Sequence, residues 1–248
     1  MADVDFEIRD SIATVTLRRG KVNALNPGVV GQLDSAFRKL EGNSDARAIV
    51  LTGQGKFFSF GFDVPELLSF TQDQFIAFVR EFTALYTYLF VYPKPVVAAL
   101  NGHAVAGGCM LALTADRRIM TDGHATIGLN EIAFGSSAFA GAVEMLRFCT
   151  GDRAATEVLY TGALYTPNEA RDLGLIDAVV PAADVLEHAR RMAETLARNP
   201  PAFASLKKLL RASVAEEMRR REQASIVEMA GIWYSPATWA NLHDIRIR

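Results

Sequence analysis

The stretch Asn101–Leu113, NGHAVAGGCMLAL, carries no charged side chain and places Gly107 and Gly108 directly before an apolar run. It could be a membrane segment, a phosphate loop, or the start of a buried helix whose first N–H groups remain free. The uncharged residues 96–115 match the roughly twenty residues that span a bilayer. An asparagine, a histidine and three glycines interrupt them. We therefore predict a buried strand, a turn and a buried helix, and no membrane association.

The composition narrows the choice of partner and compartment. A chain of 248 residues, half of them hydrophobic, can bury the core of one large domain. Its 26 basic and 28 acidic residues give a net charge of −2, so we predict no nucleic-acid partner. Two cysteines and four scattered histidines predict no metal site and no disulfide framework. Because no signal-peptide pattern is present either, we expect a reducing, cytoplasmic compartment.

Strand and helix signals alternate through the first three quarters of the chain. Val4–Ile8 and Ile12–Leu17 alternate apolar and polar residues and predict a hairpin. Asn26 followed by proline predicts a helix start, and Ala48–Thr52 predicts a buried strand after that helix. Thr71 has capping-box spacing before another helix.

The end of the chain has a different pattern. Thr166–Leu175 combines an N-cap threonine, a proline and a C-terminal glycine, which predicts a short helix, and IDAVVP follows as a strand. From about Asp184 onward only helical patterns remain, with a break at Asn199. We predict an α/β core over residues 1–185 and a helical region over residues 186–248.

The glycines of the opening stretch are spaced wrongly for nucleotide phosphates. GHAVAGG lacks the glycine spacing of a dinucleotide fingerprint, and TGQGKFF lacks that of a P-loop. If Gly107 and Gly108 begin a helix, their N–H groups belong to its unsatisfied first turn and suit an oxyanion. The alternative is that Ala106, Gly107 and Gly108 are small only so that a strand and a helix can pack closely.

Three segments in order carry a family resemblance: FSFGFDV (58–64), NGHAVAGGC (101–109) and IGLNE (127–131). Together they resemble the crotonase, or enoyl-CoA hydratase/isomerase, superfamily, and the similarity extends over about Asp5 to Pro181. The resemblance implies a spiral of β-β-α repeats with a C-terminal helical region that makes homotrimers or dimers of trimers. It also implies acyl-CoA thioester substrates and no further cofactor, since coenzyme A is part of the substrate.

The resemblance also assigns residues to the site. It places the two backbone N–H donors that hold the thioester oxygen at Phe62 and Gly107, where most relatives have a small side chain in place of Phe62. Each such donor contributes about 3 kcal/mol to stabilising the enolate. The resemblance implies that coenzyme A lies along two stretches of the chain and beside the second glycine of the pair. The expected contacts are Val22, Ala24, Leu25, Phe60, Gly61, Asp63, Val64 and Gly108. Asp63 is also expected to have a structural role in its turn. Lys56 or Lys207 is a candidate phosphate contact.

The acid-base residues separate the subfamilies. Hydratases of this superfamily carry two glutamates, one directly after GGC and one in the later motif, whereas this chain has Met110 and Glu131. A methionine cannot exchange a proton, so efficient addition of water is disfavoured. One buried glutamate with a raised pKa suffices for a 1,3-proton shift. The motifs resemble the Δ3-Δ2-enoyl-CoA isomerases of fatty-acid oxidation more than the hydratases.

Several alternatives remain open at this point. The chain could carry out another crotonase-fold reaction, such as weak hydration, thioester hydrolysis or decarboxylation, or bind acyl-CoA without catalysis. Glu131 could instead cap or pair locally. The apolar stripe of Phe75, Phe78 and Phe82 could line an acyl pocket or hold the core. His103 is expected to pack rather than to react.

Overall fold

A six-stranded sheet forms one layer of the computed structural model, which describes residues 2–245. Its strands β1 and β2 pair antiparallel and every later neighbour pairs parallel, which confirms the predicted hairpin. In spatial order they are β1 (Val4–Arg9), β2 (Ile12–Leu17), β3 (Ala48–Gly53), β5 (Val96–Leu100), β7 (Arg117–Thr121) and β9 (Ala178–Val180).

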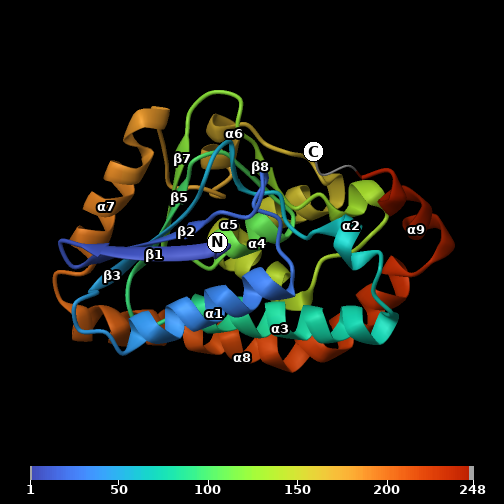
Figure 1. Cartoon of the computed structure of the whole chain (residues 1–248), viewed down its shortest axis with the longest axis horizontal. Helices are drawn as coiled ribbons and strands as arrows, with labels where there is room; N and C mark the ends of the chain where they lie inside the picture. Colours follow the sequence, from blue (N-terminus) through green and yellow to red (C-terminus); the bar gives the residue numbers. More distant parts are fainter. Residues whose placement is uncertain (1, 246–248) are drawn as a thin grey trace.

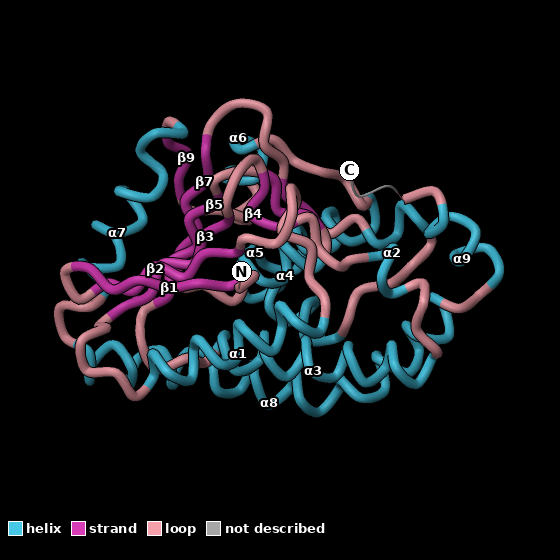
Figure 2. The backbone as a smooth tube through the Cα atoms, in the orientation of Figure 1, coloured by secondary structure: helices cyan, strands magenta, loops and turns pink. Residues whose placement is uncertain are grey.

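A second, three-stranded parallel sheet lies beside the first (Figure 2). It contains β4 (Phe57–Ser59), β6 (His103–Val105) and β8 (Ile127–Gly128). From β3 onward the strands alternate along the chain between the two sheets, so each turn of the spiral adds one strand to each. This is the expected crotonase-like α/β spiral. The sequence analysis missed the small sheet because its strands have only two or three residues.

The helices α1, α3 and α8 run side by side beneath the sheets (Figure 1). The Asn26 side chain caps α1, and Thr71 and Gln74 form the predicted capping box of α3. The helices are α1 (Pro27–Glu41), α2 (Val64–Leu67), α3 (Gln72–Phe90), α4 (Gly107–Leu113), α5 (Ala140–Thr161), α6 (Pro167–Asp172), α7 (Val185–Leu196), α8 (Pro200–Trp233) and α9 (Pro236–His243). None of the helices in the described residues is long and apolar enough to cross a membrane.

The C-terminal region is helical, as expected, and packs on two different parts of the core. Helix α7 covers one face of the large sheet, where Val185, Ala189 and Ala193 meet strand residues. Helix α8 instead packs against α3 and α5. The boundary between a core of residues 1–185 and a helical region of residues 186–248 remains a prediction. The last residues of that region, 246–248, lie outside the described part of the chain.

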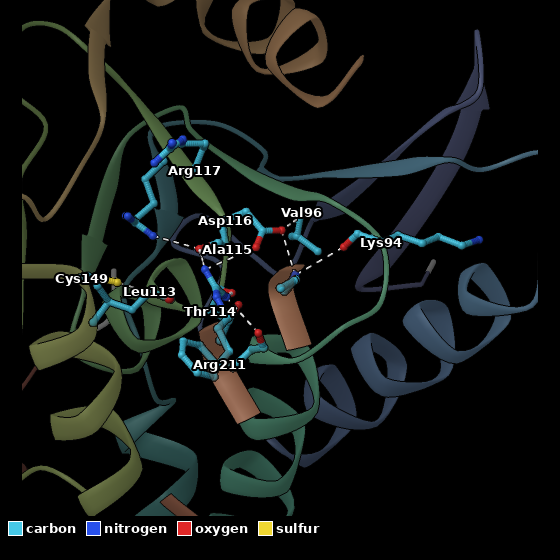
Figure 3. A network of polar contacts seen from close by, with 12 residues as sticks. Lys94, Val96, Leu113, Thr114, Ala115, Asp116, Arg117, Cys149 and Arg211 are labelled. Atoms are coloured by element: carbon cyan, nitrogen blue, oxygen red, sulfur yellow. Dashed lines mark hydrogen bonds and ion pairs between the residues drawn. The ribbon is translucent and has the colours of Figure 1, made fainter. Parts of the chain in front are cut away.

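A buried ionic network attaches α8 to the large sheet (Figure 3). The Asp116 carboxylate accepts from the Lys207 ammonium at 2.8 Å and from the Val96 N–H at 2.8 Å, and it pairs with Arg211 at 3.3 Å. Arg211 also donates to the carbonyl oxygens of Phe90, Thr114 and Ala115. Burial lowers the pKa of Lys207 to about 8 despite its partner. Lys207 is therefore occupied inside the protein, and the expectation that it contacts a coenzyme A phosphate is wrong.

Removal of the shared carboxylate should destabilise the fold strongly. We expect Asp116→Ala to lower the free energy of unfolding by about 3–5 kcal/mol, because Lys207 and Arg211 would stay buried without their acidic partner. Urea unfolding at pH 7 measures the change. The control is Lys208→Ala on the exposed side of the same helix, which should change it by less than about 0.5 kcal/mol. A loss below about 1 kcal/mol for Asp116→Ala would contradict the anchoring role.

Candidate active site

The three motif segments meet because each contains part or all of one strand of the small sheet and continues past its carboxyl end. Strands β4, β6 and β8 are parallel, so their carboxyl ends lie at one edge. A cavity of about 270 Å³ opens there. It is lined by Phe60, Phe62, Val64, Val105, Ala106, Gly107, Met110, Asn130, Glu131, Ala133, Phe134, Ser136, Phe139, Met229, Trp233 and Ile245.

The first backbone donor of the cavity is the Gly107 amide. Helix α4 begins at Gly107, as predicted, so this N–H has no acceptor within the helix. The preceding residue, Ala106, has φ +50° and ψ −120°, a conformation that favours glycine, and this sharp turn separates β6 from α4. Backbone strain of this kind costs about 1–3 kcal/mol and is common at functional sites.

The second donor is the Phe62 amide. The Leu25 N–H donates to Gly61 and the Asp63 N–H donates to Leu25, which fixes the chain on both sides of Phe62. Within residues 2–245, neither the Phe62 nor the Gly107 amide donates to a protein acceptor. At Gly61 φ is +95°, and a methyl group there would lie 3.0 Å from the Gly107 nitrogen. The two loops thus touch at a point that only glycine allows, with a free N–H on each.

Glu131 is the acidic group of the cavity. It begins the 3₁₀ turn Glu131–Phe134 directly after β8 and is 7% exposed. Burial raises the pKa of its carboxyl group to about 7, and only a hydrogen bond from its own backbone opposes the shift. Its Oε2 atom has no protein partner among the described residues. Within residues 2–245 Glu131 forms no ion pair, so the pairing alternative has no support, and its local contact is the hydrogen bond from its own backbone.

Met110 and the Phe62 ring make the rest of the cavity apolar. Met110 lies on the first turn of α4 and is 1% exposed. The Phe62 ring contacts Phe78 and Phe82 edge-on, each at a centroid distance of 5.0 Å. Phe75 stacks on Trp233 instead. The aromatic stripe of α3 therefore supports the cavity from behind and does not line it.

The expected coenzyme A residues divide between two places. Phe60 and Val64 line the cavity, whereas Val22 lines a separate hollow of about 640 Å³ with Arg18, Lys21 and Lys56. The Phe57 and Phe60 rings, one from each hollow, are in contact at 5.9 Å. Lys56 was expected near coenzyme A from the sequence, whereas Arg18 and Lys21, which precede the Val22 stretch, were not.

The remaining expected residues have structural contacts. Ala24 and Leu25 are buried beside the Phe62 loop. Asp63 caps α2 and pairs with Arg19 at 2.5 Å, in agreement with a structural role in its turn. A methyl group at Gly108 would lie 2.2 Å from the Ser59 carbonyl oxygen, so this glycine lets α4 approach β4. Direct contact of these residues with coenzyme A remains a prediction.

His103 has a packing environment, and no metal-binding cluster accompanies it in the described residues. The Nδ1 atom of His103 accepts from the Thr126 N–H at 3.1 Å, and its ring lies 5.0 Å from that of Phe57, which is the expected packing role. In residues 2–245 no cluster of three or more His, Cys, Asp or Glu side chains has the arrangement of a metal site.

Comparison with known proteins agrees with this geometry. A profile described as enoyl-CoA hydratase/isomerase matches residues 7–231. The chain belongs to this family. It is 39% identical over 195 residues to a putative enoyl-CoA hydratase of Thermus thermophilus, covering 76% of this chain and 75% of that protein. It is 30% identical over 243 residues to the mouse mitochondrial enoyl-CoA delta isomerase 1, covering 97% and 84%.

Solved structures give the same family. The human mitochondrial Δ3-Δ2-enoyl-CoA isomerase superposes with a TM-score of 0.92 at 28% identity, covering 97% of this chain and 95% of that one. Family members named hydratase and members named isomerase are thus both similar to this chain. This similarity assigns the chain to the enoyl-CoA hydratase/isomerase enzymes, which act on acyl-CoA thioesters. It does not distinguish hydration from isomerisation, so the residues of the site must indicate the reaction.

Several residues that line the cavity were not assigned to the site from the sequence, among them Asn130, Ser136, Phe139, Met229 and Trp233. Phe139 precedes α5, a helix that was not predicted because its polar and apolar residues are poorly segregated and Gly151 interrupts it at φ +77°. Met229 and Trp233 are one turn apart on α8, a spacing that indicates a shared helix face without identifying its partner.

The buried Glu131 carboxyl should make the stability of the protein depend on pH. Its folded pKa of about 7 lies above the unfolded value, so the folded state binds more protons between the two and stability falls as pH rises through that window. Glu131→Gln removes this loss. We expect the variant to exceed the wild type in free energy of unfolding by up to about 3 kcal/mol at pH 8, and by much less at pH 4.5.

Urea unfolding of both proteins across this pH range measures the difference, and the comparison cancels other groups such as Glu222, whose pKa is also raised to about 7 by burial. A difference that is constant from pH 4.5 to 8 would show that the carboxyl of Glu131 is not buried as described.

Proposed function

We propose that this protein is a Δ3-Δ2-enoyl-CoA isomerase, which moves a 3-enoyl double bond to the 2-trans position. One observation carries the proposal. Among the described residues that line the cavity, Glu131 is the single ionisable side chain. Met110 occupies the position where a hydratase of this superfamily is expected to have its second acid. One carboxyl group and two free amides meet the needs of a proton shift and do not provide a second acid to position water.

The proton shift proceeds in two steps. The Glu131 carboxylate removes a proton from C2. The electron pair of that C–H bond forms a double bond between C1 and C2, and the carbonyl electron pair moves onto the thioester oxygen, which gives a dienolate with the C3=C4 bond still in place. The N–H groups of Phe62 and Gly107 donate to that oxygen, where the negative charge develops. The protonated Glu131 then returns the proton at C4, and the thioester carbonyl forms again. A pKa of about 7 lets the same group act first as base and then as acid.

The apolar walls favour the same reaction. Met110, Phe62 and Phe139 exclude water from the carboxyl group, which raises its pKa and protects the dienolate. Thioester hydrolysis, decarboxylation and hydration remain alternative reactions within the family. Acyl-CoA binding without catalysis remains a non-enzymatic alternative. Each makes a different product, or none, from the two enoyl-CoA isomers.

Assays with separate 3-hexenoyl-CoA and 2-hexenoyl-CoA test the proposal. We expect the first to give the conjugated 2-enoyl thioester, and the second to give almost no 3-hydroxy product.

Glu131→Gln should lower kcat for isomerisation by about 10²–10⁴-fold, because an amide of the same size cannot accept the proton. In wild type, kcat/KM should rise with pH up to about 7 and then level off. Fast hydration, or full activity of Glu131→Gln, would refute the mechanism.

A substitution at Met110 tests whether the missing second acid limits hydration. Met110→Glu places a second carboxyl group opposite Glu131 and should raise hydration of 2-hexenoyl-CoA above the wild-type rate. Met110→Gln is the matched control, since it adds a polar group of similar size that cannot transfer a proton, and hydration should not rise. Equal hydration by both variants would show that polarity, and not a second acid, limits the reaction.

We also propose that coenzyme A lies with its phosphates near Arg18, Lys21 and Lys56 and its thioester end past Phe60. The three cations surround one hollow at Val22, and the contact of Phe57 with Phe60 connects it to the cavity. Lys56→Ala should raise KM for 3-hexenoyl-CoA several-fold and leave KM for the phosphate-free pantetheine thioester unchanged. A rise of equal size for both substrates would rule out a phosphate contact.

A homotrimer, alone or as a dimer of trimers, is the oligomer that we propose. Leu206, Leu209 and Leu210 on α8 are 60%, 77% and 65% exposed, an apolar surface that subunit contacts would cover. A reducing, cytoplasmic compartment stays a prediction, which the unpaired thiols of Cys109 and Cys149 support.

A further inference from the structure

Unpartnered polar atoms are concentrated at the active-site cavity. Within residues 2–245, seven buried side-chain polar atoms have no hydrogen-bond partner. Four of them belong to residues that line the cavity: Asn130 Oδ1, Glu131 Oε2, Ser136 Oγ and Trp233 Nε1. The proton shift uses Glu131 and leaves the other three without a role.

Leaving these three atoms unpaired is costly. Trp233 is 2% and Ser136 7% exposed, so bulk water does not satisfy them. A buried polar atom without a partner costs about 1–3 kcal/mol. Native proteins rarely keep such groups unless a ligand or an ordered water completes them. Three of them beside one cavity therefore indicate that its occupant carries a polar group.

Asn130 and Ser136 lie on either side of the 3₁₀ turn Glu131–Phe134, and Trp233 lies on α8. The Ser136 N–H donates to the Glu131 carbonyl oxygen at 2.9 Å, which fixes Ser136 next to the 3₁₀ turn. The indole of Trp233, at the end of α8, stacks on the Phe75 ring with centroids 4.6 Å apart. The polar group of the occupant would thus be bound between the Glu131 turn and α8.

Their chemistry selects the occupant. The indole Nε1 of Trp233 can only donate, the Oδ1 atom of Asn130 can only accept, and the Ser136 hydroxyl can do both. A ligand hydroxyl group complements all three, because it accepts from the indole and donates to the amide oxygen. A methylene group at the same place would leave every one of them unpaired.

We propose that Asn130, Ser136 and Trp233 form a subsite for a hydroxyl oxygen, so that the preferred acyl groups are short chains bearing a hydroxyl group. The inference rests on the proposed function, since it assumes that the acyl group fills this cavity. Its volume of about 270 Å³ is at the small end of ligand pockets and fits a short chain. An ordered water is the other source of such an oxygen.

Binding measurements test the subsite without requiring turnover. Hexanoyl-CoA, heptanoyl-CoA and octanoyl-CoA would be titrated calorimetrically against their 6-, 7- and 8-hydroxy analogues. We expect at least one hydroxylated ligand to bind about tenfold more tightly than its parent, which corresponds to one or two net hydrogen bonds. Because these saturated ligands cannot isomerise, this result does not depend on whether the enzyme is an isomerase.

Variants then assign the preference to the polar atoms. Trp233→Phe keeps a ring to stack on Phe75 and removes the indole N–H, and Ser136→Ala removes the hydroxyl group. Each should reduce the affinity ratio of hydroxylated to parent ligand toward one. Met229→Leu, an apolar change in the same cavity, is the matched control and should leave that ratio within about twofold of the wild type.

Two outcomes would overturn the proposal. If no hydroxylated ligand of the series is preferred and Trp233→Phe weakens both members of a pair equally, the polar atoms hold a water and not an acyl hydroxyl. If a preference exists but persists in both variants, the hydroxyl group binds elsewhere. Absence of isomerase activity with 3-hexenoyl-CoA and its 6-hydroxy analogue, together with the binding preference, would reject the proposed function alone.

Discussion

Three strands of two or three residues each, β4, β6 and β8, pair in parallel, and their carboxyl ends therefore lie at one edge. One segment of the candidate site follows each strand, with the Phe62 amide after the first, the Gly107 amide after the second and Glu131 after the third. Segments separated by many residues in the chain come together through this pairing. Between these short strands the chain returns to the large sheet. A sheet of such short strands is too small to be stable alone, so it depends on the large sheet for support.

The site combines groups that each oppose folding. Two amides without acceptors, a positive φ at Ala106 and a buried carboxyl group are all unfavourable in the empty protein. They are also what an enolate-forming reaction requires, since donors and base are already in place when charge develops. The surrounding contacts compensate for them. The Asp116 network holds α8 against the sheet, and α8 in turn brings Trp233 to the cavity.

The starts of several helices, the hairpin and part of the candidate site could be predicted from the sequence, because residues close together in the chain determine them. Capping residues gave the starts of α1 and α3, alternation gave the hairpin, and the glycine pair gave the start of α4. The resemblance of the three motifs placed Glu131, Phe62 and Gly107 in one site. What escaped prediction depends on tertiary contact. The strands of the small sheet are too short for a periodic signal, and nothing local shows that Trp233 or Ser136 reaches the cavity. Lys207 was misassigned since its partner Asp116 is distant in the chain.

In the proposed mechanism one buried carboxyl group, that of Glu131, carries the proton from C2 to C4. This transfer is tested most directly by following the isotope in 3-hexenoyl-CoA deuterated at C2, with mass spectrometry and NMR of the 2-enoyl product at early conversion in ordinary water. We expect deuterium at C4 in a substantial fraction of the product, because Glu131 is shielded from solvent while the dienolate is bound. A product with only solvent hydrogen at C4, even at the earliest times, would contradict transfer by a single shielded acid.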